Sequence, residues 1–261
     1  MIETEFRFDA YLAHDGGAIE GWSFAAMSST GRTDADPMPW SYGSIVIPWI
    51  QRAESMLDMG TGGGELLSNL RPLPAETHAT EAWAPNITVA RARLEPLGVR
   101  VHALEHESDP LPFAEATFDL VINRHGSYDP AEVFRVLKPG GRFITQQVGG
   151  RNNRDLNDLF ETAPGIDDPS WNLERASREV IGANFQIADR REAFPAARFY
   201  DIGALVFYLR AIPWQIAGFS VEAFRGKLFE LHLLIESQGW LETSEHRFLI
   251  EAEKPRSAGV S

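Results

Sequence analysis

Residues 56–67, with the sequence MLDMGTGGGELL, place four glycines within five positions directly after a short apolar run. Glycine inside a regular element costs about 0.5–1 kcal/mol relative to alanine, so such a cluster indicates that something approaches the backbone closely. A buried strand that ends at glycine and leads into a helix is also where open α/β sheets bind their ligands. The stretch therefore predicts a cofactor site at the carboxyl end of a strand.

The chain on both sides of this stretch alternates between strand and helix patterns. Short apolar or β-branched runs indicate strands at residues 54–60, 77–83, 99–104, 118–123, 142–148 and 246–254. Helical patterns lie between them at residues 63–70, 84–98 and 129–141, and Pro-Gly-Gly stops the last one. This alternation predicts βαβ units and a mostly parallel sheet with helices on both faces.

The sequence contains no repeat and no low-complexity linker, so we expect one domain over residues 1–261. Residues 51–150 form the predicted cofactor-binding core, and residues 151–261 form the C-terminal half. Residues 1–50 and 195–238 fall outside the strand and helix alternation. They are predicted to form an N-terminal cap and a helical insertion before the last strand.

The composition excludes several kinds of site. The chain carries 37 acidic and 24 basic side chains, a net charge of −13, and no run of Lys and Arg that would make a basic face. Binding of nucleic acid through its phosphates is therefore disfavoured. There is no cysteine, which excludes disulfides, thiolate zinc sites and cysteine nucleophiles and fits a reducing cytoplasm. We expect no metal site.

Neither a secretory signal nor a membrane span is expected. The first residues, MIETEFRFDAYL, carry acids where a signal peptide would carry positive charge. The longest apolar stretch, residues 202–219, is interrupted by Arg210 and Pro213 and is too broken to span a bilayer. The sequence predicts a cytoplasmic protein that does not act at a membrane.

Three ligands compete for the glycine stretch. A phosphate loop needs a Lys directly after the glycines, and this chain has none there. A dinucleotide fingerprint needs a third glycine or alanine where this chain has Glu65, whose carboxylate would face the pyrophosphate. The third ligand is S-adenosylmethionine (SAM), whose sulfonium and ammonium outweigh its carboxylate, so that acidic surroundings favour it. The residues favour SAM.

The pattern Asp58-x-Gly60-x-Gly62-x-Gly64 resembles the first motif of class I SAM-dependent methyltransferases. The resemblance continues in order with Glu81, EHESDPLPF at 105–113, FDLVINRH at 118–125 and RVLKPGGRF at 135–143. The last motif is typical of the ubiquinone-methyltransferase-like (type 11) branch. The resemblance covers residues 55–148 and implies a Rossmann-like, doubly wound α/β fold with a seven-stranded, mostly parallel sheet. It also implies SAM as the cofactor and methyl transfer as the reaction.

The resemblance further implies which residues hold the cofactor. Glu81 would bind the ribose hydroxyls, and Glu107 would meet the adenine amino group. Glu105 or Asp109 could take the adenine role under a small shift of register, while RVLKPGG is structural under every interpretation. The predicted cofactor-binding residues are Asp58, Gly60, Thr61, Gly62, Gly64, Glu81, Ala82, Glu107, Ser108 and Asn123.

His125 is the predicted catalytic residue. It follows the fourth strand, near the place where methyl donor and acceptor should meet, and a neutral histidine can accept a proton from a hydroxyl acceptor. Alternatively, it hydrogen-bonds the methionine end of the cofactor or caps the next turn. Gln146 and Gln147, at the end of the fifth strand, could orient a polar acceptor.

The acceptor is expected to be a small molecule, methylated on oxygen, nitrogen or carbon. Enzymes that methylate amino groups of nucleic acids and proteins often carry Asn/Asp-Pro-Pro-Tyr/Phe after the fourth strand, and here no proline follows Asn123. Residues 1–50 and 195–225 are expected to form the walls of an apolar acceptor pocket, with the aromatic side chains of Trp22, Trp40, Tyr42, Tyr208 and Trp214. An RNA methyltransferase and a SAM-binding protein without transferase activity are the alternatives; Glu65 argues against a nicotinamide-dependent oxidoreductase.

Overall fold

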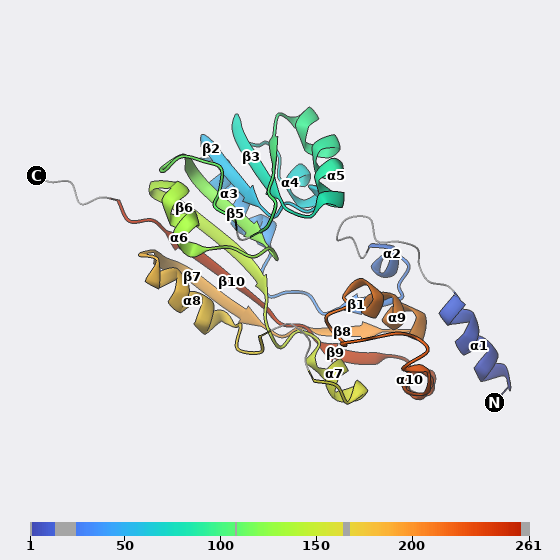
Figure 1. The fold of residues 1–261 in the computed structure, drawn as a ribbon. Helices are drawn as coiled ribbons and strands as arrows, with labels where there is room; N and C mark the ends of the chain where they lie inside the picture. The colour runs from blue at the N-terminus through green and yellow to red at the C-terminus, as the bar shows by residue number, and fades with distance from the viewer. Residues whose placement is uncertain (1, 14–24, 108, 164–167, 257–261) are drawn as a thin grey trace, which may run out of the picture. The chain divides into compact units, whose positions relative to one another are not determined.

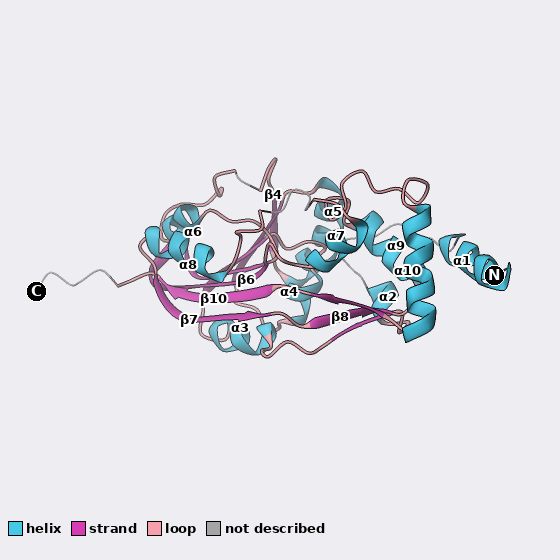
Figure 2. Ribbon diagram, turned by 90° about the horizontal axis from the view of Figure 1, so that it is seen from below, coloured by secondary structure: helices cyan, strands magenta, loops and turns pink. Residues whose placement is uncertain are grey.

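The computed structural model describes residues 2–13, 25–107, 109–163 and 168–256, and its contacts divide the chain into two compact units. Unit 1 combines residues 1–38, 150–171 and 193–246, and unit 2 combines residues 39–149, 172–192 and 247–261. Each unit has its own β-sheet, as the ribbons in Figures 1 and 2 show.

Unit 2 is built on a seven-stranded sheet with the strand order β4-β3-β2-β5-β6-β10-β7. The first five of these strands pair in parallel, whereas β10 runs antiparallel to β6. The strands are β2 (Ser55–Met59), β3 (Glu76–Glu81), β4 (Arg100–Ala103), β5 (Phe118–Arg124), β6 (Leu137–Val148), β7 (Gln186–Ala193) and β10 (Arg247–Glu253). The predicted α/β fold with a mostly parallel seven-stranded sheet is confirmed.

The strand order reverses at the centre of this sheet. The chain runs outward from β2 through β3 to β4, then returns to β5 beside β2 and continues outward to β6. Doubly wound sheets bind their ligands at the carboxyl ends of the strands where the order reverses. The glycine stretch begins at the end of β2, so the fold places it at this position.

Helices cover both faces of the unit 2 sheet. They are α3 (Tyr42–Ile50), α4 (Glu65–Asn69), α5 (Ala84–Leu94), the 3₁₀ helix η1 (Glu95–Leu97), α6 (Pro130–Val136) and α8 (Leu173–Gly182). Figure 2 shows α3 on the side of β7 and β10 opposite α6 and α8. Because both faces are covered, the side chains of β2 and β5 are buried on either side, among them Met56, Leu57, Leu120 and Ile122.

The Pro-Gly-Gly of residues 139–141 lies inside β6, so the prediction that a helix reaches this sequence is wrong. Helix α6 ends at Val136, and β6 begins at Leu137, which pairs with Phe118. The register between β5 and β6 then shifts before Leu120. Extra residues on one strand form a bulge, and Gly140, with φ of 82°, supplies the left-handed backbone that such an irregularity needs.

Unit 1 has a three-stranded antiparallel sheet in the order β1-β8-β9, formed by β1 (Thr33–Ala35), β8 (Ala196–Phe199) and β9 (Leu241–Ser244). Its helices are α1 (Ile2–Ala13), α2 (Ala25–Ser28), α7 (Arg154–Phe160), α9 (Ile202–Ala211) and α10 (Arg225–Gln238). Its core joins apolar side chains of α9 and α10 to Phe8 of α1 and Phe160 of α7. Within residues 195–238, α9 and α10 are helical, β8 pairs with strands on both sides, and residues 212–224 form turns between the two helices.

The two segments predicted to cap the core differ in where they belong. Residues 195–238 lie in unit 1, as do residues 1–38, whereas residues 39–50 belong to unit 2 and form α3 and the segment before it. Tyr42 of α3 is buried, and its hydroxyl donates to the carbonyl of Asn123 at 3.2 Å. Trp40 and Tyr42 are thus part of the parallel-sheet unit, and Tyr208 and Trp214 belong to unit 1. Trp22 lies outside the described residues, and the predicted pocket stays a prediction.

We expect Gly64→Ala to destabilise the protein more than Gly98→Ala. Both glycines have a left-handed backbone, with φ of 80° and 85°, so both variants suffer strain. A Cβ on Gly64 would lie 2.7 Å from Cγ of Leu94, whereas a Cβ on Gly98 meets open space. Overpacking costs about 1–3 kcal/mol, so urea denaturation should show an additional loss of about that size in Gly64→Ala. Equal losses in the two variants would mean that Leu94 does not confine this turn.

Candidate cofactor and acceptor site

The glycine loop between β2 and α4 is held by its own backbone. Gly60, Gly62 and Gly64 have φ of 65°, 63° and 80°, a left-handed conformation that side chains other than glycine rarely adopt. The backbone N–H of Thr61 donates to the carbonyl of Thr80 in β3 at 2.9 Å, and the N–H of Gly64 donates to the Thr61 carbonyl at 3.0 Å. The loop therefore exposes backbone rather than side chains along part of its length.

Glu81, the last residue of β3, joins the glycine loop to the turn that follows β3. Its carboxylate accepts hydrogen bonds from the backbone N–H groups of Gly62 at 2.7 Å, Ala82 at 3.1 Å and Trp83 at 2.8 Å. Burial raises the pKa of Glu81. The three N–H donors lower it in part, whereas the charge of Glu107 raises it further. The structure thus brings together Glu81, Ala82 and the loop glycines.

Asp58 is a buried carboxyl group one residue before the end of β2. It is 4% exposed, and burial raises its pKa to about 7, with a further contribution from the charge of Glu81. The Thr61 hydroxyl moderates this rise, although its oxygen is buried and makes no hydrogen bond of normal geometry within the described residues. Two carboxyl groups and one buried hydroxyl therefore lie beside the glycine loop.

Glu107 is exposed in the loop between β4 and β5, and it contacts the loop that follows β5. Its carboxylate accepts hydrogen bonds from the backbone N–H of Ser127, at 3.3 Å, and from the Ser127 hydroxyl. Asp109 instead accepts from the backbone N–H of His106, within its own loop. The carboxylate that faces the β5 loop is therefore Glu107, while the neighbouring predicted residue Ser108 lies outside the described residues.

Asn123 is fully buried, and its amide links three strand ends. Its Nδ2 donates to the carbonyl of Met59 at 3.1 Å, and its Oδ1 accepts from Thr145 Oγ1 at 2.9 Å and from Gln147 Nε2 at 2.6 Å. The Asn123 oxygen and one of the two amide hydrogens are therefore hydrogen-bonded within the protein. A contact of Asn123 with a cofactor stays a prediction.

The loop after β5 packs directly on the glycine loop. A Cβ on Gly60 would lie 3.5 Å from Cα of Gly126, and a Cβ on Gly126 would lie 3.5 Å from Cα of Gly60. The same Cβ on Gly126 would approach Asn123 Nδ2 to 3.1 Å. Two glycines thus let the loops meet backbone to backbone, and the spacing of motifs in the sequence did not single out Gly126.

His125 stands next to this contact and is held in a left-handed conformation, with φ of 65°. Its backbone N–H donates to the carbonyl of Gln146 at 2.8 Å, and its Nε2 lies 3.2 Å from Gln146 Nε2. Gln146 Oε1 accepts from the indole N–H of Trp40 at 2.9 Å. Desolvation, followed by the guanidinium groups of Arg124 and Arg247, lowers the pKa of His125. The residue is nevertheless exposed, so solvent screening reduces these effects.

The low pKa changes what can be expected of His125. The sequence predicted a base that titrates in the ordinary histidine range, whereas the structure surrounds the ring with groups that favour its neutral form. A pH–rate limb caused by this residue would therefore lie below that range. The catalytic role of His125 stays a prediction.

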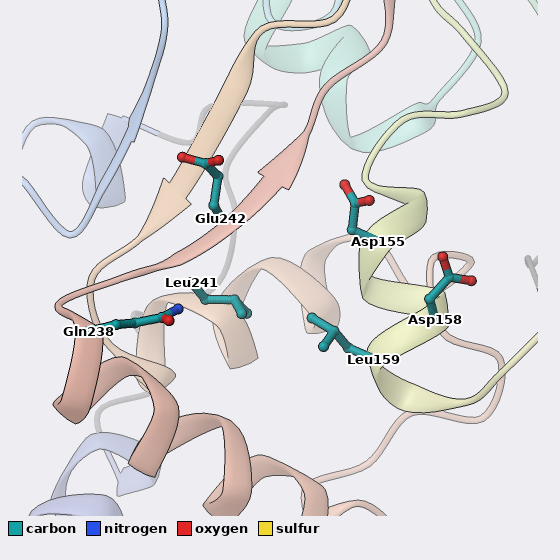
Figure 3. A pocket seen from close by; sticks show the side chains of 6 residues that line it. All are labelled: Asp155, Asp158, Leu159, Gln238, Leu241 and Glu242. Carbon is teal, nitrogen blue, oxygen red and sulfur yellow. The ribbon is translucent and has the colours of Figure 1, made fainter.

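A separate hollow of about 480 Å³ lies in unit 1, and Figure 3 shows its lining side chains. They come from α7, the end of α10 and β9, and are Asp155, Asp158, Leu159, Gln238, Leu241 and Glu242. Asp155 accepts from the backbone N–H of Ser244, and Glu242 pairs with Arg198. No group of three His, Cys, Asp or Glu side chains in the described part of the chain could hold a metal ion.

Residues 57–145 match the family described as a methyltransferase domain. The demethylmenaquinone methyltransferase of Thermus thermophilus is 32% identical over 114 residues, which cover 40% of this chain and 52% of that protein. The chain thus spans about half the length of the curated relatives it matches. The matched residues contain the glycine loop and the ends of β2, β3 and β5.

Two solved structures share the fold. A protein of Bacillus halodurans C-125, described as a candidate methyltransferase, superposes with a TM-score of 0.58 at 18% identity and covers 83% of this chain and all of that chain. The cyclase SpnF superposes with a TM-score of 0.51 at 15% identity, over 98% of this chain and 94% of that chain. At these identities the likeness establishes the fold.

We expect the stability of the protein relative to Asp58→Asn to fall as the pH rises from 5 to 8. The pKa of Asp58 is raised in the folded state, so the proton that the native protein retains stabilises it at low pH, and this contribution is lost as the pH rises through about 7. The slope should reach at most about 1.4 kcal/mol per pH unit. Urea denaturation at several pH values measures this difference.

Asp119→Asn is the matched control, because the pKa of Asp119 is shifted in the opposite direction. Burial at the start of β5 would raise this pKa, but hydrogen bonds from Lys138 and Ser55 outweigh burial and lower it. Its contribution to stability is present above the ordinary Asp pKa and is lost only at more acidic pH. The difference between the parent protein and Asp119→Asn should stay constant from pH 5 to 8. A constant difference for Asp58→Asn as well would show that Asp58 is ionised throughout.

Proposed function

We propose that residues 57–145, which match the methyltransferase domain family, form a class I methyltransferase domain, and that the chain transfers the methyl group of SAM to a small-molecule acceptor. The observation that carries the proposal is the joint arrangement of the glycine loop and Glu81 at the position where the strand order reverses. The acceptor is a small molecule with an oxygen, nitrogen or carbon atom that receives the methyl group.

The charge of the site supports a cationic cofactor. Asp58 and Glu81 lie on the side of the glycine loop, and the buried Thr61 hydroxyl provides a polar atom for a ligand there. A sulfonium and an ammonium near these carboxyl groups would favour their ionised forms, as opposite charges do at short distance. Bound SAM would supply an activated methyl group, and the chain's own residues would hold and orient it.

The amino end of α4 also disfavours a pyrophosphate. Glu65, in the first turn of α4, accepts a hydrogen bond from Arg93 at 2.5 Å, and the same Arg93 nitrogen donates to the Gly63 carbonyl. The guanidinium of Arg93 offsets part of the charge of this carboxylate. The side chain of Glu65 nevertheless stands where a dinucleotide fingerprint needs glycine or alanine, and this supports SAM over NAD and FAD.

Orientation is the main contribution expected of such a site. A well-aligned intramolecular reaction can gain roughly 7–11 kcal/mol over its bimolecular counterpart. Glu81 and the loop backbone would fix the ribose, Glu107 would receive the adenine amino group, and Gly60 and Gly126 would leave room for close approach. The predicted roles of Asp58, Gly64, Ala82 and Asn123 belong to the same proposal.

Two alternatives are separated from this proposal by experiment. The first alternative is a SAM-binding protein without transferase activity, because a cyclase shares the fold. It would bind SAM but yield no methylated product from any small acceptor. An RNA methyltransferase finds no support among the relatives, and a shift of an RNA band at physiological salt would be needed to revive it.

The location and the domain division are also proposals. No helix among the described residues is long and apolar enough to cross a membrane. Action in the cytoplasm, without a membrane or nucleic-acid partner, stays a prediction. So does the treatment of residues 1–261 as one functional methyltransferase domain.

We expect Glu81→Ala to weaken SAM binding about ten- to a hundredfold, because charge-assisted hydrogen bonds to the ribose hydroxyls contribute about 1.5–3 kcal/mol. Isothermal titration calorimetry with SAM and S-adenosylhomocysteine measures the change. Glu81→Gln keeps an oxygen that can accept from the backbone N–H groups and so preserves the loop. If SAM affinity falls in both variants, collapse of the loop alone cannot explain the loss.

Glu76→Ala is the matched control, since Glu76 lies at the opposite end of β3, exposed and paired with Arg100. It should leave the dissociation constant unchanged. Unchanged binding in the Glu81 variants would move the ribose contact elsewhere. Failure of the parent protein to bind either ligand would overturn the proposed function.

A further inference from the structure

Three side chains of unit 2 form a chain of contacts that ends on His125. The indole Nε1 of Trp40 lies 2.9 Å from Gln146 Oε1, and Gln146 Nε2 lies 3.2 Å from His125 Nε2. Trp40 and Gln146 are buried, 8% and 5% exposed. Since the backbone N–H of His125 donates to the carbonyl of Gln146, a single residue fixes both the backbone and the ring of His125.

The direction of each hydrogen bond follows from the atoms available. An indole nitrogen can only donate, so the amide atom that faces Trp40 must be the oxygen of Gln146. The amide nitrogen then faces His125, and it too can only donate. Nε2 of His125 must therefore be the unprotonated nitrogen, and the neutral ring carries its hydrogen on Nδ1.

The same contacts oppose a charged ring. An imidazolium carries a hydrogen on both nitrogens, so its Nε2–H would point at the N–H group of the Gln146 amide. The atom left for a ligand is Nδ1, which makes no hydrogen bond to any residue that the structure describes. His125 thus offers an N–H donor, and its lone pair is already in use.

We infer that His125 is a fixed hydrogen-bond donor, and that the methyl acceptor is a small molecule with an ionised oxygen, a phenolate or an enolate, bound to its Nδ1–H. The inference rests on the proposed methyltransferase function and replaces the base predicted from the sequence by a donor. Trp40 and Gln146 are positioning residues, because they act on the acceptor only through the ring of His125.

The surrounding charges fit an anion on this side of the site. Arg124 and Arg247 lie close enough to His125 to disfavour its positive charge, and the same field favours a negative oxygen. At the glycine loop, the Glu81 carboxylate accepts three backbone N–H bonds and supplies an acidic group for a cation. A cationic methyl donor and an anionic acceptor would therefore each meet residues of opposite charge.

Transfer to an ionised oxygen needs no base. An oxygen lone pair forms the new bond to the methyl carbon, and the bond between that carbon and sulfur breaks with its electron pair onto sulfur. The negative charge of the acceptor and the positive charge of the sulfonium are both lost, and no proton moves. A hydrogen bond from Nδ1–H would hold the oxygen and align it for this displacement.

Nitrogen-15 NMR of the histidine-labelled full-length protein, with saturating S-adenosylhomocysteine, tests the tautomer. The His125→Ala spectrum assigns the signals among the seven histidines. We expect a protonated Nδ1 and an unprotonated Nε2 from pH 6 to 9. A proton on Nε2 in the parent protein overturns the inference.

Two variants test whether the contacts cause this state. In Gln146→Glu, the carboxylate accepts from Trp40 and from His125 Nε2–H, so the proton should move to Nε2 and the pKa of His125 should rise by at least about one unit. Trp40→Phe frees the amide to rotate and should give a mixture of tautomers. Tyr42→Phe, whose lost hydroxyl bonds only backbone carbonyls, should leave the tautomer unchanged. An unchanged tautomer in both Gln146→Glu and Trp40→Phe counts against the inference.

The acceptor class is tested with 4-nitrophenolate and its neutral counterpart nitrobenzene at pH 8.5, again with S-adenosylhomocysteine bound. We expect 4-nitrophenolate to shift the His125 Nδ1–H signal and to bind at least about tenfold more weakly to His125→Ala, the equivalent of one charge-assisted hydrogen bond. Nitrobenzene should not distinguish the two proteins.

Calorimetry of S-adenosylhomocysteine separates the possible failures. If this ligand does not bind, the proposed function fails whatever the tautomer. If it binds, and 4-nitrophenolate binds the parent protein and His125→Ala equally, only the present inference is overturned.

Discussion

The buried amide of Asn123 is the constraint on which the rest of the site depends. It ties the end of β2, through Met59, to the end of β6, through Thr145 and Gln147, and it sits on β5 between them. Leaving one buried polar group of this kind without a partner costs about 1–3 kcal/mol. The three strand ends are therefore fixed relative to one another, and the loops that leave them begin from fixed positions.

Much of the parallel-sheet unit could be predicted from the sequence because its signals are local. An apolar run that ends in glycines specifies a strand and a tight turn within a dozen residues, and Glu81 lies at the end of the next strand. The structure adds that the Glu81 carboxylate bonds the Gly62 backbone, which explains why an acid and a glycine so far apart belong to one site. The helix expected up to residue 141 was too long because a bulge in a strand has the same Pro and Gly content as a helix stop.

The remaining features depend on contacts between distant parts of the chain. Trp40 and Gln146 are 106 positions apart, and no periodicity relates them. The strands of the three-stranded sheet are only three or four residues long, too short to show the alternation that identifies a strand. The state of His125 could not be inferred either, because a sequence shows that a histidine is present but not which of its nitrogens has a donor beside it.

The path of the backbone between the two units has a consequence for any attempt to divide the protein. The chain passes from one unit to the other five times, after residues 38, 149, 171, 192 and 246. No single proteolytic cut can therefore release either unit as an intact, continuous fragment. Removing the first 38 residues would take β1 from its place beside β8 and leave that strand with an unpaired edge, a feature that promotes aggregation. Expression of the parallel-sheet unit alone would require joining three separated segments of the chain.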